Sequence, residues 1–128
     1  MTTDLLARNM YQEHILDLYR NPPHFGTMKD ATHTRRSLNP LCGDDITISL
    51  RVKGGVIEDA RFSGTGCALS IASAGLLTDE IIGKTTDQVE VLTKDTVLDL
   101  LGIPVGPVRL KCTLLPLEAI QLALGGHE

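Results

Sequence analysis

Aromatic residues are scarce in this 128-residue chain, which contains two Phe, two Tyr and no Trp. Surfaces that stack the bases of single-stranded nucleic acid depend on aromatic side chains, so the composition argues against that function. Positive charge is also in deficit, because 12 Lys and Arg stand against 16 Asp and Glu, a formal net charge of −4. We therefore expect neither nucleic acid nor an anionic membrane surface as a partner.

Long apolar runs and paired cysteines are missing as well. No apolar stretch approaches the roughly 20 residues that cross a bilayer, and the first residues lack the basic and apolar regions of a signal peptide. The three cysteines form no Cys-x-x-Cys pair, and their odd number argues against a disulfide framework. We expect a cytoplasmic protein with reduced thiols, and the length predicts a single domain, residues 1–128.

What the chain does have is three cysteines in three different local contexts. Cys42 is followed two residues later by Asp44, Cys67 lies among glycines, and Cys112 follows Lys111. A buried cysteine often serves as a small hydrophobe, but glycine and proline around Cys42 and Cys67 are typical of loops. Three thiolates and one carboxylate complete a four-coordinate shell for a borderline-soft metal. The pattern predicts a metal site or a reactive thiol.

Hydrophobic periodicity predicts an α+β fold. Helices are expected where apolar residues recur every three to four positions, and strands where they alternate with polar ones. The expected elements are a helix over about 4–20, an edge strand over 32–38, a hairpin of strands 46–52 and 56–63, a helix over 67–82, a short helix from 85, a helix over 95–102, an extended segment 103–107, and a final helix with Pro116 in its first turn. This order predicts a small antiparallel three-stranded sheet with helices packed on one face.

The expected elements give each candidate ligand a different setting. Cys67 and Cys112 would stand at or near helix N-termini, where the helix dipole favours a thiolate. In an extended segment the side chains of Cys42 and Asp44 would point the same way. A carboxylate is a harder ligand than a thiolate, so Asp44 would be the easiest of the four to displace. Such a site favours exchange over permanent structure.

Four motifs in order connect these residues with a known family: Cys42-Gly43-Asp44, Ile57–Phe62, Gly66-Cys67 with Ser70–Ser73, and Lys111-Cys112. With them, nearly the whole chain resembles the NifU-like scaffold proteins of iron–sulfur cluster assembly, a group with a SufE/NifU-like fold that includes IscU and SufU. The resemblance implies that Cys42, Cys67 and Cys112 bind a cluster or zinc, with Asp44 as the exchangeable fourth ligand. It further implies sulfur transfer from a cysteine desulfurase of the SufS or IscS type. Sulfur or a nascent cluster, expected to be [2Fe–2S], would then pass to acceptor or carrier proteins.

The chain combines features of two branches of this family. Lys111 stands where IscU-type proteins carry histidine, and Asn39-Pro40 before Cys42 is similar to SufU. SufU proteins typically carry an extra segment between the second and third cysteines, whereas here only residues 68–111 separate them, as in IscU. The stretch 105–109 keeps half of the Leu-Pro-Pro-Val-Lys motif by which IscU is handled by a chaperone. A scaffold and a zinc-dependent sulfurtransferase both remain open.

Cys42 is the expected sulfur acceptor, because a loop bounded by glycine and proline can reach into a partner's active site. Lys111 offers a charge rather than a neutral nitrogen ligand. It would act as a counter-charge or proton donor to the thiolates, or simply as a solvated side chain.

Two other classes of function compete with a scaffold. A purely structural zinc module would hold its metal in a closed site, usually with Cys-x-x-Cys knuckles, and none is present. A hydrolase with a cysteine nucleophile would need a histidine beside one thiol. None of the four histidines has a recognisable triad partner; they are His14, His24, His33 and His127.

Overall fold

A three-stranded antiparallel sheet with the order β1–β2–β3 forms one layer of the molecule. The structure, a computed structural model, describes residues 13–40 and 43–125. The strands are β1 (His33–Asn39), β2 (Asp44–Lys53) and β3 (Val56–Thr65). The predicted hairpin is present, and Gly54 and Gly55 form its turn with φ of 61° and 76°. Positive φ at both central residues is the geometry that matches the twist of the flanking strands, and glycine adopts it without steric cost.

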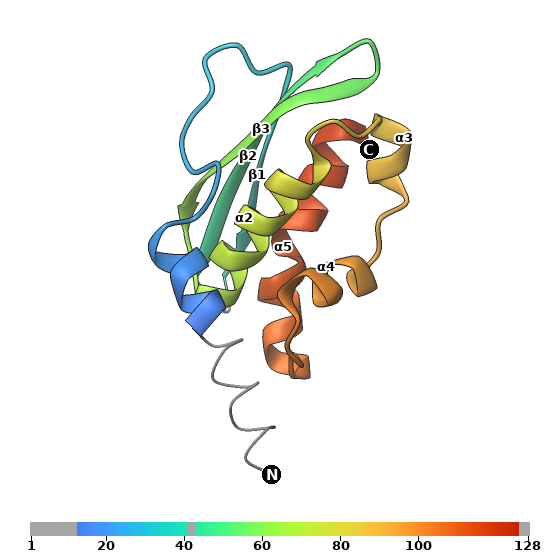
Figure 1. Ribbon diagram of the computed structural model, residues 1–128. Helices are drawn as coiled ribbons and strands as arrows, with labels where there is room; N and C mark the ends of the chain where they lie inside the picture. Colours follow the sequence, from blue (N-terminus) through green and yellow to red (C-terminus); the bar gives the residue numbers. More distant parts are fainter. Residues whose placement is uncertain (1–12, 41–42, 126–128) are drawn as a thin grey trace.

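Helices supply the other layer. In the described part of the chain, four helices follow the sheet in the sequence: α2 (Ala68–Ile81), α3 (Thr86–Glu90), α4 (Lys94–Leu101) and α5 (Pro107–Gly125). In Figure 1, α2 and α5 lie side by side on one face of the sheet, and α4 packs beside them. The predicted α+β fold, with helices on one face of a small antiparallel sheet, is confirmed.

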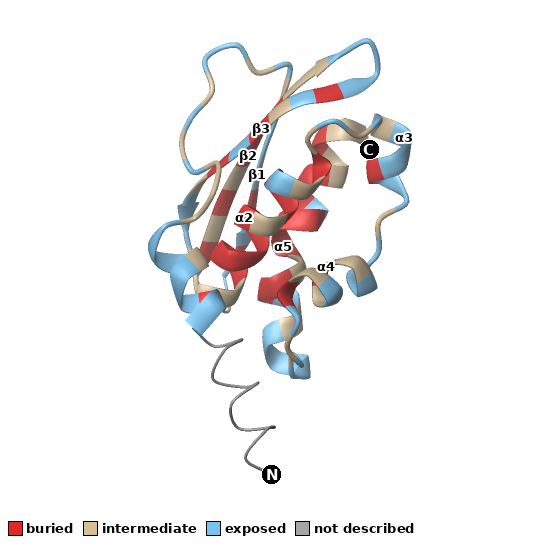
Figure 2. Ribbon diagram, viewed as in Figure 1, coloured by how far each residue is buried: buried red, intermediate tan, exposed pale blue. Residues whose placement is uncertain are grey.

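The hydrophobic core lies between the two layers, and Figure 2 shows buried residues along the strands and along α2 and α5. Period-two alternation places Ile46, Ile48 and Leu50 of β2 on the helix side of the sheet, each fully buried. Phe62 of β3 lies opposite Ile48 in the strand register and is equally buried. This side of the sheet therefore anchors the helices that carry two of the three cysteines.

The helix boundaries agree with the predicted ones except at the last helix. A helical segment spans residues 13–20 and ends before Pro22, and the predicted start near residue 4 lies outside the described residues. Thr85 caps α3 with a reciprocal capping box to Gln88. Helix α4 begins at Lys94 rather than Asp95 and ends at Leu101, with Gly102 as its C-cap at a φ of 73°.

Helix α5 corrects the prediction for the C-terminal part of the chain. It begins at Pro107, so Pro116 lies inside the helix and not in its first turn. Pro107 provides a fixed φ suited to the first helical position, where the missing N–H costs nothing. The same φ also fits an extended segment, and for that reason the predicted helix start was too late.

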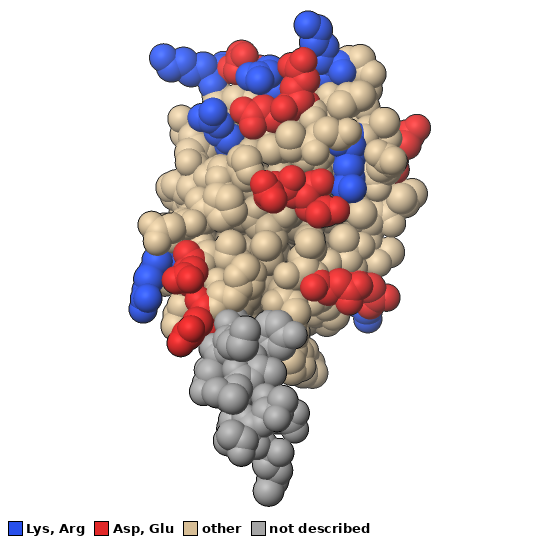
Figure 3. All heavy atoms as spheres, viewed as in Figure 1, with Lys and Arg blue, Asp and Glu red and all other residues tan. Residues whose placement is uncertain are grey.

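Charged side chains cover the outside without separating by sign. On the face shown in Figure 3, acidic and basic side chains are interspersed around the end that carries the β2–β3 hairpin. Arg51 of β2, for example, pairs with both Asp30 and Glu58. None of the described helices combines the length and apolar character that a membrane span requires.

Candidate metal centre

Asp44, Cys67 and Cys112 come together at one end of the sheet, although they are far apart in the sequence. One carboxylate oxygen and the two Sγ atoms all lie within 4.8 Å of one another. Asp44 is the first residue of β2, Cys67 immediately precedes α2, and Cys112 lies on α5. The sheet and both packed helices therefore each contribute one side chain.

Asp44 is almost completely buried, with 1% of its surface exposed. Its Oδ1 atom accepts hydrogen bonds from the backbone N–H of Cys67 at 2.9 Å and from Ser70 Oγ at 3.4 Å. Its Oδ2 atom is buried and has no hydrogen-bond partner in the described part of the chain. Burial of a carboxylate oxygen without a partner costs free energy, and a bound cation would offset this cost.

The adjacent aspartate has the opposite environment. Asp45 points to the outer face of the sheet, where Arg36 donates to both of its carboxylate oxygens at 2.9 and 2.8 Å. These hydrogen bonds lower the pKa of Asp45, and Asp45 in turn raises the pKa of Arg36. Alternation along β2 thus separates two neighbouring carboxylates into an exposed ion pair and a buried group beside the cysteines.

Cys67 is the N-cap residue of α2, at the helix N-terminus where the sequence placed it. An N-cap side chain usually accepts a hydrogen bond from the first turn, but the Cys67 side chain makes no such bond. Its backbone N–H instead donates to Asp44, and its carbonyl accepts from Ile71 N–H at 3.1 Å. The sulfur is therefore not used as a helix cap, and it lies beside Asp44 and Cys112.

Cys112 lies in the second turn of α5, which begins at Pro107, whereas the sequence placed it at or near the start of its helix. It is 1% exposed. The side-chain Nδ2 of Asn39 donates to its Sγ at 3.5 Å, and Ser73 Oγ of α2 donates to the carbonyl of Thr113 at 2.7 Å. The sulfur is therefore held by packing and side-chain contacts rather than presented at a helix end.

Gly66 leaves space for the carboxylate. A Cβ atom at this position would lie 2.7 Å from Asp44 Oδ1 and would also collide with Ser70 Oγ. No real side chain fits there without displacing one of these groups. Glycine at position 66 is thus a condition for the present position of Asp44.

Three residues that contact the predicted ligands were not themselves predicted from the sequence: Asn39, Gly66 and Ser70. Gly66 and Ser70 belong to the motif around Cys67, and Asn39 belongs to the Asn-Pro pair before Cys42. The signal in the sequence that could have identified them is a small or amide side chain at a fixed offset from a cysteine. Only the fold shows which atom each one contacts.

The remaining predicted site residues are placed as follows. Cys42 lies outside the described residues. Lys111 is exposed and borders a groove of about 330 Å³ that is also lined by Asn39 and Glu118. Among the described histidines, His24 bonds Asp79 at 3.0 Å, and neither it, His14 nor His33 joins the cluster.

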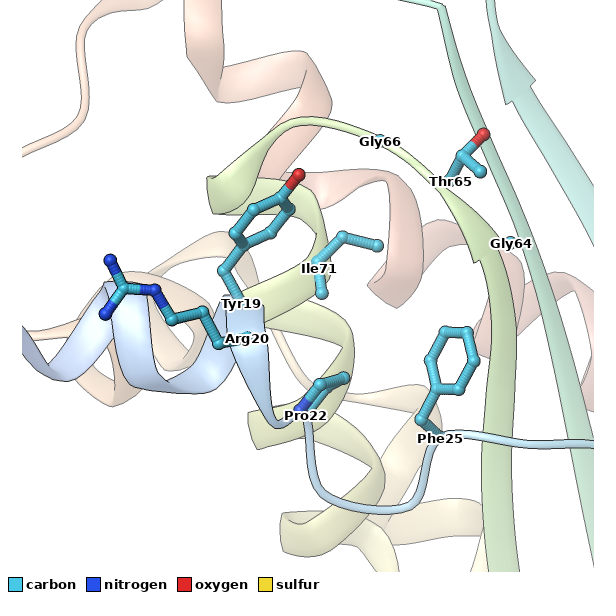
Figure 4. Close-up of a pocket in the computed structure, with 8 residues that line it drawn as sticks. All are labelled: Tyr19, Arg20, Pro22, Phe25, Gly64, Thr65, Gly66 and Ile71. Atoms are coloured by element: carbon cyan, nitrogen blue, oxygen red, sulfur yellow. The ribbon is translucent and has the colours of Figure 1, made fainter.

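An open pocket of about 440 Å³ lies beside the loop that leads to Cys67. Figure 4 shows Tyr19, Phe25 and Ile71 pointing into it from three different segments, with residues 64–66, at the end of β3 and just after it, along one side. Phe25 packs edge-on against the buried Phe62, with ring centroids 5.2 Å apart. This contact holds the loop of residues 21–26 in place. The pocket is lined by aromatic side chains and also by Gly66, the residue before Cys67.

The donor set fits zinc or an iron–sulfur cluster. Both take thiolate ligands, and zinc also takes carboxylate oxygen. Neighbouring donors of a tetrahedral zinc site stand about 3.8 Å apart, so the limit of 4.8 Å requires only a small inward movement. No described residue bonds the buried Oδ2 of Asp44, and this observation supports a bound cation.

The fold brings two thiols and one carboxylate together from a sheet and two helices. This defines a class of small α+β proteins whose site is built from thiols and a carboxylate. Residues 10–128 match the sequence family described as NifU-like N terminal domain. The chain belongs to this family, as its sequence motifs predicted.

Curated relatives named SufU and IscU both align over nearly the whole chain. The chain is 31% identical to the zinc-dependent sulfurtransferase SufU of Bacillus subtilis (strain 168), covering 93% of this chain and 92% of that protein. It is 32% identical to the iron–sulfur cluster assembly scaffold protein IscU of Escherichia coli (strain K12), covering 92% of this chain and 94% of that protein.

Solved structures share the fold. A putative iron–sulfur cluster assembly scaffold protein for the SUF system from Fervidobacterium islandicum AW-1 matches with a TM-score of 0.75 and 28% identity, covering 88% of this chain and 94% of that one. The N-terminal part of a NifU-like protein from Brucella abortus matches with a TM-score of 0.73 over 90% of this chain and 92% of that one, and at 22% identity it supports the fold alone.

Proposed function

We propose that this protein is an iron–sulfur cluster assembly scaffold that accepts sulfur from a cysteine desulfurase and binds iron, a nascent cluster or zinc. The observation that carries the proposal is the convergence of Asp44, Cys67 and Cys112, together with a buried Asp44 oxygen that has no partner among the described residues. Relatives named as an iron–sulfur scaffold and as a zinc-dependent sulfurtransferase support it. A metal-free function would leave the buried Asp44 oxygen unexplained.

Four side chains would hold the metal: Cys42, Asp44, Cys67 and Cys112. A bound metal would stabilise the thiolate forms and order the site. Asp44 is the ligand that leaves, because its oxygen is harder than sulfur and because its other oxygen already accepts hydrogen bonds from Cys67 N–H and Ser70. These two bonds would keep the carboxylate in place while Oδ2 exchanges.

Cys42 would accept the sulfur. Its thiolate attacks the terminal sulfur of a desulfurase persulfide, a new S–S bond forms on Cys42, and the bond to the desulfurase cysteine breaks so that this cysteine leaves as a thiolate. Lys111, exposed beside the groove that Asn39 borders, would serve as counter-charge or proton donor to the thiolates. The sulfur would then enter a transient cluster, for which [2Fe–2S] is the expected form, once two electrons from an external thiol reductant have reduced it to sulfide.

The partners would be a cysteine desulfurase of the SufS or IscS type and downstream acceptor or carrier proteins, in the cytoplasm. The pocket with Tyr19, Phe25 and Ile71 is a suitable contact surface for the desulfurase, because exposed aromatic side chains in a pocket are typical anchors of protein interfaces. It borders Gly66, next to Cys67. A partner seated there would have its reactive sulfur close to the cluster of ligands.

A second candidate is a zinc-dependent sulfurtransferase that relays persulfide sulfur without building a cluster. Lys111 favours it, because the residue before the last cysteine offers no nitrogen ligand to a cluster. A purely structural zinc module is disfavoured by the extensive core of the fold, which does not depend on the site.

Anaerobic reconstitution of the full chain with iron, cysteine and a desulfurase distinguishes these functions. A scaffold develops sulfur-to-iron charge-transfer absorption, and a competing zinc titration suppresses it. Persulfide formation without a chromophore indicates a sulfur relay. If neither persulfide nor chromophore forms, while removal of zinc unfolds the chain, both proposals are wrong and the metal is structural.

A further inference from the structure

Asn39 is a buried amide that contacts the candidate metal centre without belonging to the predicted ligands. It is the last residue of β1 and 9% exposed. Its Nδ2 atom donates to Cys112 Sγ at 3.5 Å. A buried amide needs partners for its polar atoms, and here one of them is a thiolate candidate.

The strand register explains why this contact exists. Asn39 pairs with Asp44 across the β1–β2 ladder, and side chains of directly opposed residues lie on the same face of a sheet. That face is covered by α5, which carries Cys112. One pair of opposed residues thus provides a carboxylate to the centre and a hydrogen-bond donor to one of its sulfurs.

We infer that Asn39 is a positioning residue for the metal centre: its amide N–H holds the Cys112 sulfur in its binding orientation and withdraws charge from it once a metal is bound. This inference rests on the proposed metal binding. A metal-bound thiolate has no proton and can only accept a hydrogen bond, so the donor must be the amide. Partners of this kind orient the ligands and tune the metal they hold.

The charge effect has a spectroscopic consequence. A hydrogen bond stabilises the filled sulfur orbitals, so more energy is needed to move an electron from sulfur to the metal. Removing the donor should therefore shift the sulfur-to-metal charge-transfer band to lower energy. A residue that merely supports the fold would not move this band.

Cobalt(II) loading of the full chain tests the inference with three variants: Asn39→Ala, Asn39→Asp and Ser37→Ala. Ser37 is the matched control, because it lies two residues earlier on the same face of β1 and is similarly buried, at 8% exposure. We expect Asn39→Ala to shift the band to lower energy and to weaken cobalt and zinc binding about 10- to 100-fold. Asn39→Asp keeps the shape but replaces the donor by a negatively charged acceptor, so binding should weaken further. Ser37→Ala should behave like wild type.

A second measurement needs no variant. In ¹⁵N-labelled wild-type protein loaded with ¹¹³Cd, the side-chain amide proton of Asn39 that is bonded to Cys112 Sγ should show scalar coupling to cadmium through that sulfur. Absence of this coupling, while the Cys112 β-protons do couple to cadmium, overturns the inference. So does an Asn39→Ala spectrum and affinity equal to those of Ser37→Ala. If wild-type protein binds no thiophilic metal at all, the proposed function itself has failed.

Discussion

Asn39 and Asp44 form the last pair of the antiparallel β1–β2 ladder, and each contacts a different cysteine of the cluster. Asn39 donates to Cys112 Sγ, whereas Asp44 accepts from the backbone N–H of Cys67. The end of one strand pair therefore links the two helices that carry these cysteines. Changes in this region should alter metal binding before they alter the fold.

Zinc binding provides the first prediction. The isolated chain should hold about one zinc ion, and affinity should fall as the pH falls, because the thiols must lose their protons to bind. The apo chain should stay folded, since its core of sheet and helices is complete without the site. Metal analysis at several pH values and circular dichroism of the apo form measure these properties. Conversion of the apo form to a random coil would favour a structural module.

Asp44→Ala should still bind metal through three thiolates but should transfer its cargo to an apo-acceptor more slowly, about 10-fold or more. The reason is that the exchangeable ligand has been removed. Asp45→Ala is the matched control, because Asp45 is the next residue but pairs with Arg36 on the outer face. Acceptor activation kinetics measure the difference. Faster delivery from Asp44→Ala than from wild type would contradict a productive role for this carboxylate.

Cys42→Ser should abolish persulfide transfer while the circular dichroism spectrum remains that of wild type. Cys67→Ser and Cys112→Ser should weaken metal binding more than they weaken the first sulfur-accepting step, since Cys67 is fixed as a helix cap and Cys112 is buried. Mass spectrometry after a brief anaerobic incubation with desulfurase and cysteine locates the added sulfur. Its first appearance on the Cys112 peptide would show that the assignment of Cys42 is wrong.

Gly66→Ala should weaken zinc binding about 10-fold or more without unfolding the chain. The added Cβ would lie 2.7 Å from Asp44 Oδ1, and the carboxylate must move away. Gly106→Ala is the control, because a Cβ there meets nothing within 4 Å. Zinc titration against a chelator and a thermal melt separate the two effects. Equal zinc affinities for the two variants would mean that the position of Asp44 is unimportant for binding.

Tyr19→Ala should slow sulfur transfer from the desulfurase about 10-fold, because truncated aromatic anchors commonly cost that much in binding. Zinc affinity should not change, since Tyr19 lines the pocket beside Gly66 and is not part of the cluster. Val91→Ala provides a control at an exposed apolar residue outside the pocket. Transfer rates measured over a range of desulfurase concentrations would show whether the loss lies in binding. Identical rates for the two variants would exclude the pocket as the contact surface.

The parts of the fold that follow from local pattern were predictable. Strict alternation identified β2, and the two glycines after Lys53 identified its hairpin. The start of α5 was not predictable in the same way, because Pro107 is compatible both with an extended segment and with the first position of a helix. Packing against β1, β2 and α2 decides in favour of the helix.

The candidate site was likewise predictable from the sequence only in part. Residue types and motifs were sufficient to single out Asp44, Cys67 and Cys112, which the structure brings together. The contact from Asn39 to Cys112 connects residues that are far apart in the sequence, and only strand register and helix packing produce it. The distinction between Asp44 and Asp45 likewise depends on which face of the sheet is covered.

Pro116 lies four residues after Cys112 in α5 and has no N–H to bond the carbonyl of that cysteine. The turn that carries the sulfur is thus held by one backbone bond fewer than an uninterrupted helix, and prolines inside helices are where helices bend. A single zinc ion and a [2Fe–2S] cluster require different spacings between their sulfur ligands. A more compliant turn would let the same cysteines hold either of these proposed cargoes despite their unequal size.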